Sequence, residues 1–475
     1  SMKRLSTVFE KNKISFDTKY KIEQTYSLHI TTTCAILFMG IFHMERGERF
    51  MQEKMNLAII GGGASGLIAA ITASKICKQT KKITIFEGAS RVGKKLLATG
   101  NGRCNLTNIH ASAKHYYGDT RLIEAILRTY PPQRVIQYFE EIGLLCKEES
   151  EGRIYPYSLQ ASSVLDVLRF NAEEMQVEII CDCPIHSIRP QNGIFILENH
   201  QQQTFIADKV ILATGGKASP QLGSVGNGYT LAKQLGHTVT PLYPALTILK
   251  TPPEYVKSLK GMRSHVAATL KCNGKAIRHE KGEVQFTEQG LSGICMFQFS
   301  RHVAHSIANK QKITILLDFM PEYSVSNIVN QLNHAVNLFP HLPATEILKG
   351  FINKKVGETI VKTAVPQSKE ILAEQLTKTD FMIIANAVKQ FSFPCVGVAD
   401  WKQAQVTAGG VSLSQLNSSL ESKIHKGLYF SGELLNIDGD CGGYNLNWAW
   451  ISGITAGKAA AKSLCHKDKV RISTT

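Results

Sequence analysis

The sequence predicts an α/β protein with a doubly wound parallel sheet that is discontinuous in the chain and is interrupted by an inserted β-barrel-like domain with a helical subdomain. Three observations support this. A short apolar strand near residue 56 runs through a glycine-rich turn into a helix. Two further segments of strand followed by glycine lie near residues 214 and 432. Between these two segments the apolar pattern alternates as in strands and then takes the spacing of helices.

The composition is that of an ordinary globular protein. The chain has 475 residues, of which 43% are apolar and 19% are charged, which is enough for two or three domains with a buried core. Its 11 cysteines are scattered and lack the spacing of a zinc site. We therefore expect a reducing, cytoplasmic setting and no metal.

The net charge of +16 leaves three classes of partner open: nucleic acid, a membrane surface or an anionic small molecule. The first 54 residues hold nine Lys/Arg and six Asp/Glu, so most of the excess lies in the rest of the chain. No run of five like charges occurs, and no basic segment is interleaved with aromatics. A basic, solvated surface is favoured over nucleic-acid binding.

Residues 1–54 differ from the rest of the chain. Their one apolar run, Cys34–Phe42, is too short to span a bilayer, and no signal-peptide cleavage pattern follows it. Met51 and Met55 both precede the first convincing strand. We expect this segment to be a disordered extension or a non-native start with no catalytic role.

The segment around the first glycines has the pattern of a Rossmann-like nucleotide-binding unit. An apolar strand, Asn56–Ile60, precedes Gly61, Gly63 and Gly66, and a helix follows. The first glycine permits a tight turn, the second lets the backbone approach a pyrophosphate, and the third lets the helix pack on the strand. Phosphates then lie at the helix N-terminus, and we include Ser65 among the cofactor-binding residues.

A second strand ends at Glu87, where a carboxylate would accept hydrogen bonds from ribose hydroxyl groups. An acid at this position disfavours a 2′-phosphate, so NAD or FAD is expected rather than NADP. Two later segments favour FAD, because a flavin reaches far beyond the first unit. They contribute, after their strands, Thr214, Gly215 and Gly216, and then Gly432 and Glu433.

Seven segments between Asn56 and about Lys462 carry a family resemblance: IIGGGASGL, VGKKLLATGNGRCNLTN, EGRIYPYSLQASSVLDVL, LATGGKASPQLGSVGNGYTLAKQLGH, FTEQGLSG, VTAGGVS and GLYFSGELLNIDGDCGGYNLNWAWISG. In this order they resemble the BaiN/YhiN-type three-domain bacterial flavoproteins, which include aminoacetone oxidase and a bile-acid enone reductase. The resemblance implies bound FAD and an oxidoreductase, and it leaves the substrate open because members of this family differ in reaction.

The resemblance places the loop from Gly100 to Asn105 along the flavin, where small residues and amide donors face the ring. Its predicted cofactor-binding residues are Gly100, Asn101, Arg103, Cys104 and Asn105. Lys94 or Lys95 is a candidate to neutralise the pyrophosphate, with a solvated surface lysine as the alternative. Cys104 has no neighbouring cysteine in the sequence, so we expect a packing residue rather than a redox partner.

The last helix is expected to begin near Asn445. The resemblance aims its first turn, with Gly443, Tyr444 and Asn445, at the pyrimidine end of the flavin, where a helix N-terminus stabilises negative charge. Trp448 and Trp450 are expected to pack in the core rather than to take part in chemistry.

The segment EGRIYPYS is the candidate for the substrate side. Arg153 would supply a fixed charge for a carboxylate or enolate, and Tyr155 and Tyr157 a phenol that donates or takes a proton. The alternative, that a proline turn and aromatics seal a domain joint, is equally supported. No hydrolase triad or Walker motif occurs.

The expected domain organisation is discontinuous. Within the inserted part, a hairpin is expected around Asn273 and Gly274, and the stretch from Ser368 to Phe391 has the longest amphipathic helical pattern. The predicted division is an FAD-binding domain at 55–244 and 407–467, a β domain at 245–319 and 391–406, and a helical subdomain at 320–390.

No second strand, glycine motif and helix unit for NADH lies between Cys146 and Pro394. NADH or NADPH, if used, would bind transiently over the flavin. The preferred function is NAD(P)H-linked reduction of a polarised C=C bond in a small or steroid-like substrate. The alternatives are an amine or aminoketone oxidase that uses oxygen, and an RNA-binding flavoprotein. No membrane association is expected, and the oligomeric state is left open.

Overall fold

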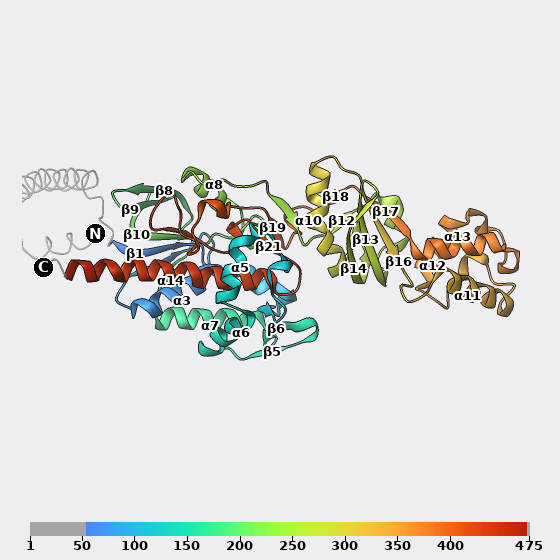
Figure 1. Cartoon of the computed structure of the whole chain (residues 1–475), viewed down its shortest axis with the longest axis horizontal. Helices are drawn as coiled ribbons and strands as arrows, with labels where there is room; N and C mark the ends of the chain where they lie inside the picture. The colour runs from blue at the N-terminus through green and yellow to red at the C-terminus, as the bar shows by residue number, and fades with distance from the viewer. Residues whose placement is uncertain (1–53, 473–475) are drawn as a thin grey trace, which may run out of the picture. The chain divides into compact units, whose positions relative to one another are not determined.

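The computed structural model describes residues 54–472 (Figure 1). The N-terminal extension expected at residues 1–54 therefore lies almost wholly outside the described residues. Two large apolar cores are present. The first draws its buried side chains from residues 55–235 and 411–464, and the second from residues 249–395.

The first core is built on a seven-stranded sheet. In spatial order its strands are β7 (Glu178–Ile180), β2 (Ile83–Phe86), β1 (Met55–Ile60), β10 (Thr204–Leu212), β9 (Ile194–Asn199) and β8 (Ile185–Gln191), with β20 (Leu428–Phe430) beside β10. The pairs β7–β2, β2–β1, β1–β10 and β10–β20 are parallel, and β8 and β9 form an antiparallel extension. The α/β class with a parallel sheet is confirmed.

Helices cover this sheet, and three small sheets border it. The helices are α3 (Ala64–Cys77), α4 (Lys94–Ala98), α5 (Thr120–Thr129), α6 (Pro132–Glu141), α7 (Ala161–Glu174), α8 (Asn227–Gln234) and α14 (Tyr444–Ile472). The small sheets pair β11 (Tyr243–Ala245) with β19 (Val406–Ala408), β4 (Tyr116–Gly118) with β21 (Ile437–Gly439), and β6 (Arg153–Pro156) with both β3 (Thr107–Asn108) and β5 (Cys146–Glu148).

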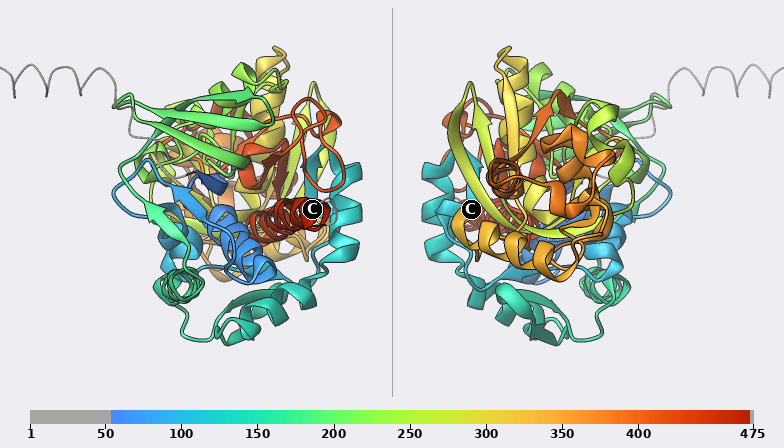
Figure 2. Two further views of the ribbon diagram at one scale, coloured as in Figure 1. Left: turned by 90° about the vertical axis from the view of Figure 1, so that its left-hand side faces the viewer. Right: turned by 90° about the vertical axis from the view of Figure 1, so that its right-hand side faces the viewer.

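The long helix α14 lies against α3 along much of its length (Figure 2). Two glycines permit this approach. A Cβ atom on Gly453 would lie 2.5 Å from the carbonyl oxygen of Ser65, and one on Gly457 would lie 2.4 Å from that of Ala69. The two helices therefore meet backbone to backbone, which fixes the first turn of α14 relative to the first turn of α3.

The second core is built on another seven-stranded sheet, in which every pair is antiparallel. Its order is β17 (Phe391–Cys395), β16 (Ile313–Asp318), β13 (Arg263–Cys272), β14 (Lys275–Phe286), β15 (Gly290–Ser292), β12 (Leu249–Lys250) and β18 (Gly397–Val398). The edge strands β17 and β18 are separated by one residue, so the sheet curls until its two edges meet, as in a barrel. Asn273 and Gly274 form the β13–β14 turn with φ of 48° and 83°, which confirms the predicted hairpin.

Helices α9 (Pro253–Val256), α10 (Ile294–Ala308), α11 (Val325–Leu338), α12 (Lys354–Ala364) and α13 (Lys378–Lys389) complete this part. The expectation of one long amphipathic helix from Ser368 to Phe391 is wrong. Two short 3₁₀ turns occupy its first half, and α13 begins only after Thr377, whose side chain and that of Asp380 form a capping box. The helix-like spacing of apolar residues continues through this segment, but the capping box at Thr377 and Asp380 starts a new helix there.

Of the predicted domain boundaries, 244/245 and 406/407 fall between the residues of the first and second cores. The boundaries at 319/320 and 390/391 lie within the second core, which is continuous across them. We retain the predicted division as a proposal. Within residues 54–472, no helix is both long enough and apolar enough to cross a membrane.

The contact between α14 and α3 predicts a specific weakness. Gly457→Ala places a methyl group against the backbone of α3, so we expect the free energy of unfolding to fall by about 1–3 kcal/mol, as for other overpacked cores. Thermal unfolding followed by circular dichroism measures the change. Gly350→Ala is the control, because a Cβ at Gly350 meets no atom within 4 Å; equal melting temperatures for the two variants would contradict the tight contact.

Candidate cofactor and substrate site

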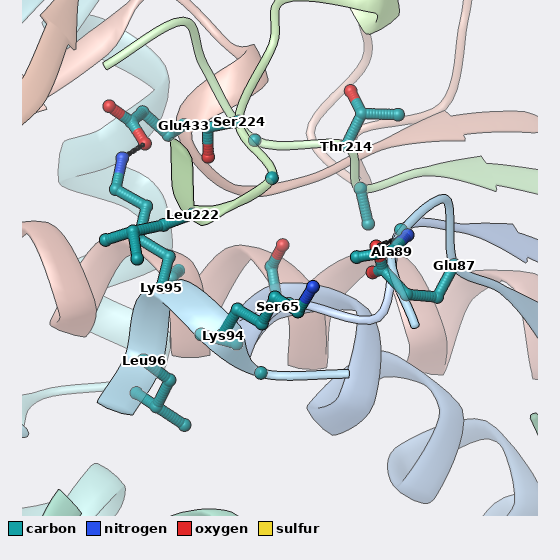
Figure 3. A pocket seen from close by; sticks show the side chains of 18 of the residues that line it. Ser65, Glu87, Ala89, Lys94, Lys95, Leu96, Thr214, Leu222, Ser224 and Glu433 are labelled. Atoms are coloured by element: carbon teal, nitrogen blue, oxygen red, sulfur yellow. Dashed lines mark hydrogen bonds and ion pairs between the residues drawn. The ribbon is translucent and has the colours of Figure 1, made fainter. Parts of the chain in front are cut away.

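A cavity of about 330 Å³ lies at the carboxyl ends of β1, β2 and β10, where ligands bind in doubly wound folds (Figure 3). Nine residues predicted to bind the cofactor line it: Gly61, Gly63, Ser65, Glu87, Lys95, Thr214, Gly215, Glu433 and Asn445. They come from five separate parts of the chain. The fold thus brings the first glycine turn, the two later strand ends and the start of α14 to one cavity.

The first turn of α3 is shaped for close approach of a ligand. Gly61 has a φ of 109°, and a Cβ there would lie 2.5 Å from the carbonyl oxygen of Ala213. A Cβ on Gly63, the N-cap of α3, would project into open space. The first turn of α3 has no acidic residue, so its amide groups can receive an anion.

Glu87 is held by the backbone on both sides. Its Oε2 accepts from the amide of Gly62 at 2.8 Å, and its Oε1 accepts from the amide of Ala89 at 2.8 Å. Each carboxylate oxygen keeps lone-pair capacity after these bonds. Since Glu87 lines the cavity, the remaining capacity can accept the two hydroxyl groups of a ribose.

Unpaired polar atoms mark the site as built for a polar ligand. Thr214 Oγ1, in the cavity wall, and Asn105 Oδ1 are buried without a hydrogen-bond partner among the described residues. Such atoms are costly to bury unless a ligand or water satisfies them. Together with the open glycine turn and the ribose acceptor, they fit an adenine dinucleotide.

Lys95 and Glu433 form an ion pair of 2.8 Å across the cavity wall (Figure 3). Glu433 Oε1 also accepts from the amide of Thr407 at 2.6 Å. The ammonium group of Lys95, predicted to meet a pyrophosphate, is therefore partly engaged by the protein. It retains two further N–H donors.

Three predicted glycines support the wall instead of lining it. A Cβ on Gly66 would lie 1.9 Å from the carbonyl oxygen of Gly61, one on Gly216 would lie 2.4 Å from Thr407 Oγ1, and one on Gly432 would lie 2.5 Å from Ser65 Oγ. Their contribution is close packing, as expected for the third glycine of the motif.

The loop predicted to run along the flavin takes left-handed backbone conformations, with φ of 56° at Gly100 and 54° at Asn101. It lies beside the cavity rather than in its wall. Cys104 is fully buried, and burial raises the pKa of its thiol to about 12. A neutral, buried thiol supports the interpretation of Cys104 as a packing residue.

The two predicted catalytic residues lie next to predicted cofactor-binding segments. Tyr155 lies beside the loop that contains Gly100, and Arg153 lies beside the residues that precede α14. A Cβ on Gly100 would lie 3.6 Å from Tyr155 Cε1, and one on Gly442 would lie 3.7 Å from Arg153 Nε. Arg103 pairs with Glu149 and places its guanidinium 4.4 Å from the centre of the Tyr155 ring.

The side chains of this substrate-side group are constrained. Burial raises the pKa of the Tyr155 phenol, so Tyr155 is protonated at neutral pH. Arg153 is paired with the exposed carboxylate of Glu151. The predicted roles of Arg153 and Tyr155 stay predictions.

The first turn of α14 is tied to its surroundings. A Cβ on Gly443 would lie 2.5 Å from the carbonyl oxygen of Thr107, and Tyr444 stacks on His115 with ring centres 4.4 Å apart. Asn445 Oδ1 accepts from the amide of Gly439, and its Nδ2 donates to the carbonyl of Gly439, both at 2.8 Å.

The two tryptophans of α14 are buried, as predicted. The indole N–H of Trp448 and that of Trp450 each donate to a backbone carbonyl. Trp448 also lines the cavity.

Sequence reasoning missed the loop that closes one side of the cavity. Leu222, Ser224 and Val225 belong to this loop, and Gln405 joins them from a distant segment. The signal that could have found it is the pair of glycines that flank Ser224 and Val225, because glycines let a backbone approach a ligand closely.

Removing the ribose acceptor tests the cavity. Glu87→Ala loses the proposed bonds to the ribose and the anchor of the turn, so we expect FAD affinity to fall about tenfold or more. The flavin-to-protein ratio after dialysis measures the effect, with Glu124→Ala on the exposed face of α5 as the control. An unchanged ratio for Glu87→Ala would remove Glu87 from the site.

The packing role of Cys104 gives a second prediction. Cys104→Ser keeps a small side chain at the same position, so we expect the bound flavin to remain reducible, as followed by its absorbance under anaerobic conditions. Loss of reduction with flavin still bound would make Cys104 a redox partner.

Comparison with known proteins identifies relatives over most of the chain. A 3-dehydro-bile acid delta(4,6)-reductase from Clostridium scindens is 36% identical over 408 residues, which are 86% of this chain and 99% of that protein. Ribosomal RNA dihydrouridine synthases from Haemophilus influenzae and Escherichia coli are 28% and 25% identical, over 85% and 84% of this chain and 97% and 96% of theirs.

The reductase relative supports the predicted enzyme class, an FAD-dependent oxidoreductase. The names of the two RNA-modifying relatives weaken the expectation that a basic, solvated surface is favoured over nucleic-acid binding. The HI0933-like protein Rossmann domain family matches residues 55–459, and the chain belongs to this family.

Proposed function

We propose that this protein is an FAD-dependent reductase that adds a hydride and a proton to a carbon–carbon double bond conjugated with a carbonyl group. The observation that carries the proposal is the single cavity that joins the glycine turn and Glu87 to the start of α14. An adenine dinucleotide accounts for the first end. A flavin accounts for the second end, where a helix N-terminus favours negative charge.

The relatives' reactions share one chemistry. A delta(4,6)-reductase of a 3-dehydro-bile acid saturates double bonds conjugated with a ketone, and dihydrouridine differs from uridine by two hydrogens on a double bond conjugated with a ring carbonyl. Both bonds accept a hydride at the carbon remote from the carbonyl. This common feature supports the reductase over the amine oxidase.

Different residues would hold different parts of the cofactor. The amides at the start of α3 receive the pyrophosphate, and Glu87 accepts the ribose hydroxyl groups. Thr214, in the cavity wall, supplies an unpaired hydroxyl oxygen for a further polar group of the cofactor. The unpaired amide oxygen of Asn105 belongs to the loop beside the cavity. When bound, the flavin supplies hydride transfer at its N5 atom.

The substrate side requires a proton and a group that polarises the carbonyl. Tyr155 is protonated at neutral pH and lies beside the loop from Gly100 to Asn105, which we propose runs along the flavin. This position suits Tyr155 to donate the proton. Arg153 offers N–H groups to the carbonyl or enolate oxygen beyond its pair with Glu151. Arg103, stacked on the ring of Tyr155, keeps the phenol in place.

The electron donor proposed is NADH or NADPH, bound transiently. Between Cys146 and Pro394 the sequence has no second nucleotide-binding glycine motif, and we assign the motif at Gly61–Gly66 to FAD, so a nicotinamide would bind without a motif of its own. The oxidase alternative needs no nicotinamide, since electrons would come from the substrate and pass to oxygen.

RNA is the second candidate substrate, favoured by two RNA-modifying relatives and by the net charge of +16. A basic surface attracts phosphates and makes binding depend on salt. The small-molecule reductase remains the first candidate, because the relative of this type has the higher sequence identity, at 36%.

An anaerobic titration with NADH and NADPH separates these possibilities. We expect loss of the oxidised-flavin band near ~450 nm with at least one nucleotide, followed by recovery when a conjugated enone is added. Recovery with uridine-containing RNA but not with enones would favour the RNA substrate. A flavin that neither nucleotide bleaches, but that an aminoketone does, would contradict the proposed reductase.

A further inference from the structure

A second cavity, of about 320 Å³, lies where the two cores meet. It shares no lining residue with the first cavity, although Ile437 lines the first and its neighbour Asn436 lines the second. The chain at the start of β21 therefore borders both cavities. The residues that define its chemistry are Tyr243, Arg301, His305, Ala408, Gly409 and Asn436.

Arg301 is fixed at this cavity by a buried acid. Its Nε donates to both carboxylate oxygens of Asp438, at 3.0 and 2.8 Å, and Asp438 is only 2% exposed. This bond crosses from α10 of the second core to β21 of the first. The guanidinium also lies 4.9 Å from the centre of the Tyr117 ring. Among the described residues, the terminal amino groups of Arg301 have no hydrogen-bond partner, so the guanidinium is held in place and keeps N–H groups for an oxyanion.

Other donors gather around Arg301. His305 follows it by one turn of α10, lines the cavity and is exposed, with its ring edge-to-face on Tyr243 at 5.9 Å between centres. Its Nδ1 lies 3.3 Å from Asn309 Nδ2, so Nε2 is the nitrogen left to donate. Ala408 and Gly409 are buried and form an apolar base. None of the lining residues is acidic, so the cavity is suited to an anion rather than to a cation.

We propose that this cavity is an oxyanion subsite that holds the carboxylate or phosphate of the substrate through Arg301, His305 and Tyr243. The identity of the ligand rests on the proposed function, whereas oxyanion binding itself does not. An anchor that shares the start of β21 with the cofactor cavity uses a remote part of the substrate to orient the reacting part. Both candidate substrate classes can carry such a group, as an organic acid or as an RNA phosphate.

Calorimetry with the FAD-loaded protein tests the subsite without turnover. Inorganic phosphate and butyrate are the two probes. The double variant Arg301→Gln, Asp438→Asn removes the guanidinium and leaves no unpaired buried charge, and we expect it to weaken binding of the preferred anion about tenfold or more. His305→Ala and Tyr243→Phe each remove one donor, and about a threefold loss is expected for each.

The matched control removes an ion pair elsewhere. Arg263→Gln, Glu283→Gln takes away an exposed pair of 3.1 Å on β13 and β14, and it should bind both probes as the wild type does. Stronger binding of butyrate would support an organic acid as the source. Stronger binding of phosphate, with salt-dependent binding of a short RNA that the Arg301 variant weakens, would support RNA.

The subsite is overturned if neither anion binds the wild type, or if both bind the Arg301 variant with unchanged affinity. If that variant does not fold, unchanged affinity in both His305→Ala and Tyr243→Phe overturns it. Loss of anion binding in these variants, with no conjugated alkene reduced by the wild type, would support the subsite and reject the proposed function.

Discussion

The whole site depends on one contact between backbones, that between Gly66 and Gly61. A side chain on Gly66 would fall 1.9 Å from the carbonyl oxygen of Gly61, so the helix α3 can sit on its strand only if this side chain is absent. The contact directs the first amides of α3 into the cavity. It also fixes the position of the glycine turn in the cavity wall, beside Glu87 and Thr214.

The glycines of α14 extend this arrangement along the molecule. Because Gly453 and Gly457 seat α14 directly on α3, the starts of the two helices are held at a fixed separation. One start faces the expected phosphates, and the other lies at the far part of the same cavity, with Asn445 in its wall. The two parts of the cavity wall are thus held relative to each other by two helices whose backbones are in contact.

Local features of the sequence were sufficient to predict the part of the cavity wall that comes from the glycine turn and Glu87. The glycine turn and Glu87 lie within one βαβ unit, where spacing alone determines geometry. The hairpin at Asn273 and Gly274 was equally readable, since these residues favour the left-handed backbone of a two-residue turn. In each case the physical cause acts within about thirty residues.

The rest required the tertiary structure. The pair Lys95–Glu433 joins residues 338 positions apart, and Arg301 meets Asp438 across 137 positions. No spacing rule links such residues in a single sequence. The misassigned helix before α13 has a different cause: the apolar period was followed through a segment in which Thr377 and Asp380 already formed the pattern of a helix start.

The late position of α14 in the chain has a consequence for folding. The face of α3 that carries Ser65 and Ala69 is covered by a helix made almost four hundred residues later, and Cys77 at the end of α3 lies 3.6 Å, sulfur to sulfur, from Cys465. During synthesis this face has no native partner until α14 itself has been made. The second core, whose buried side chains all come from residues 249–395, can form first. The nucleotide-binding half is therefore expected to be the last to become native and the more dependent on chaperones while it waits.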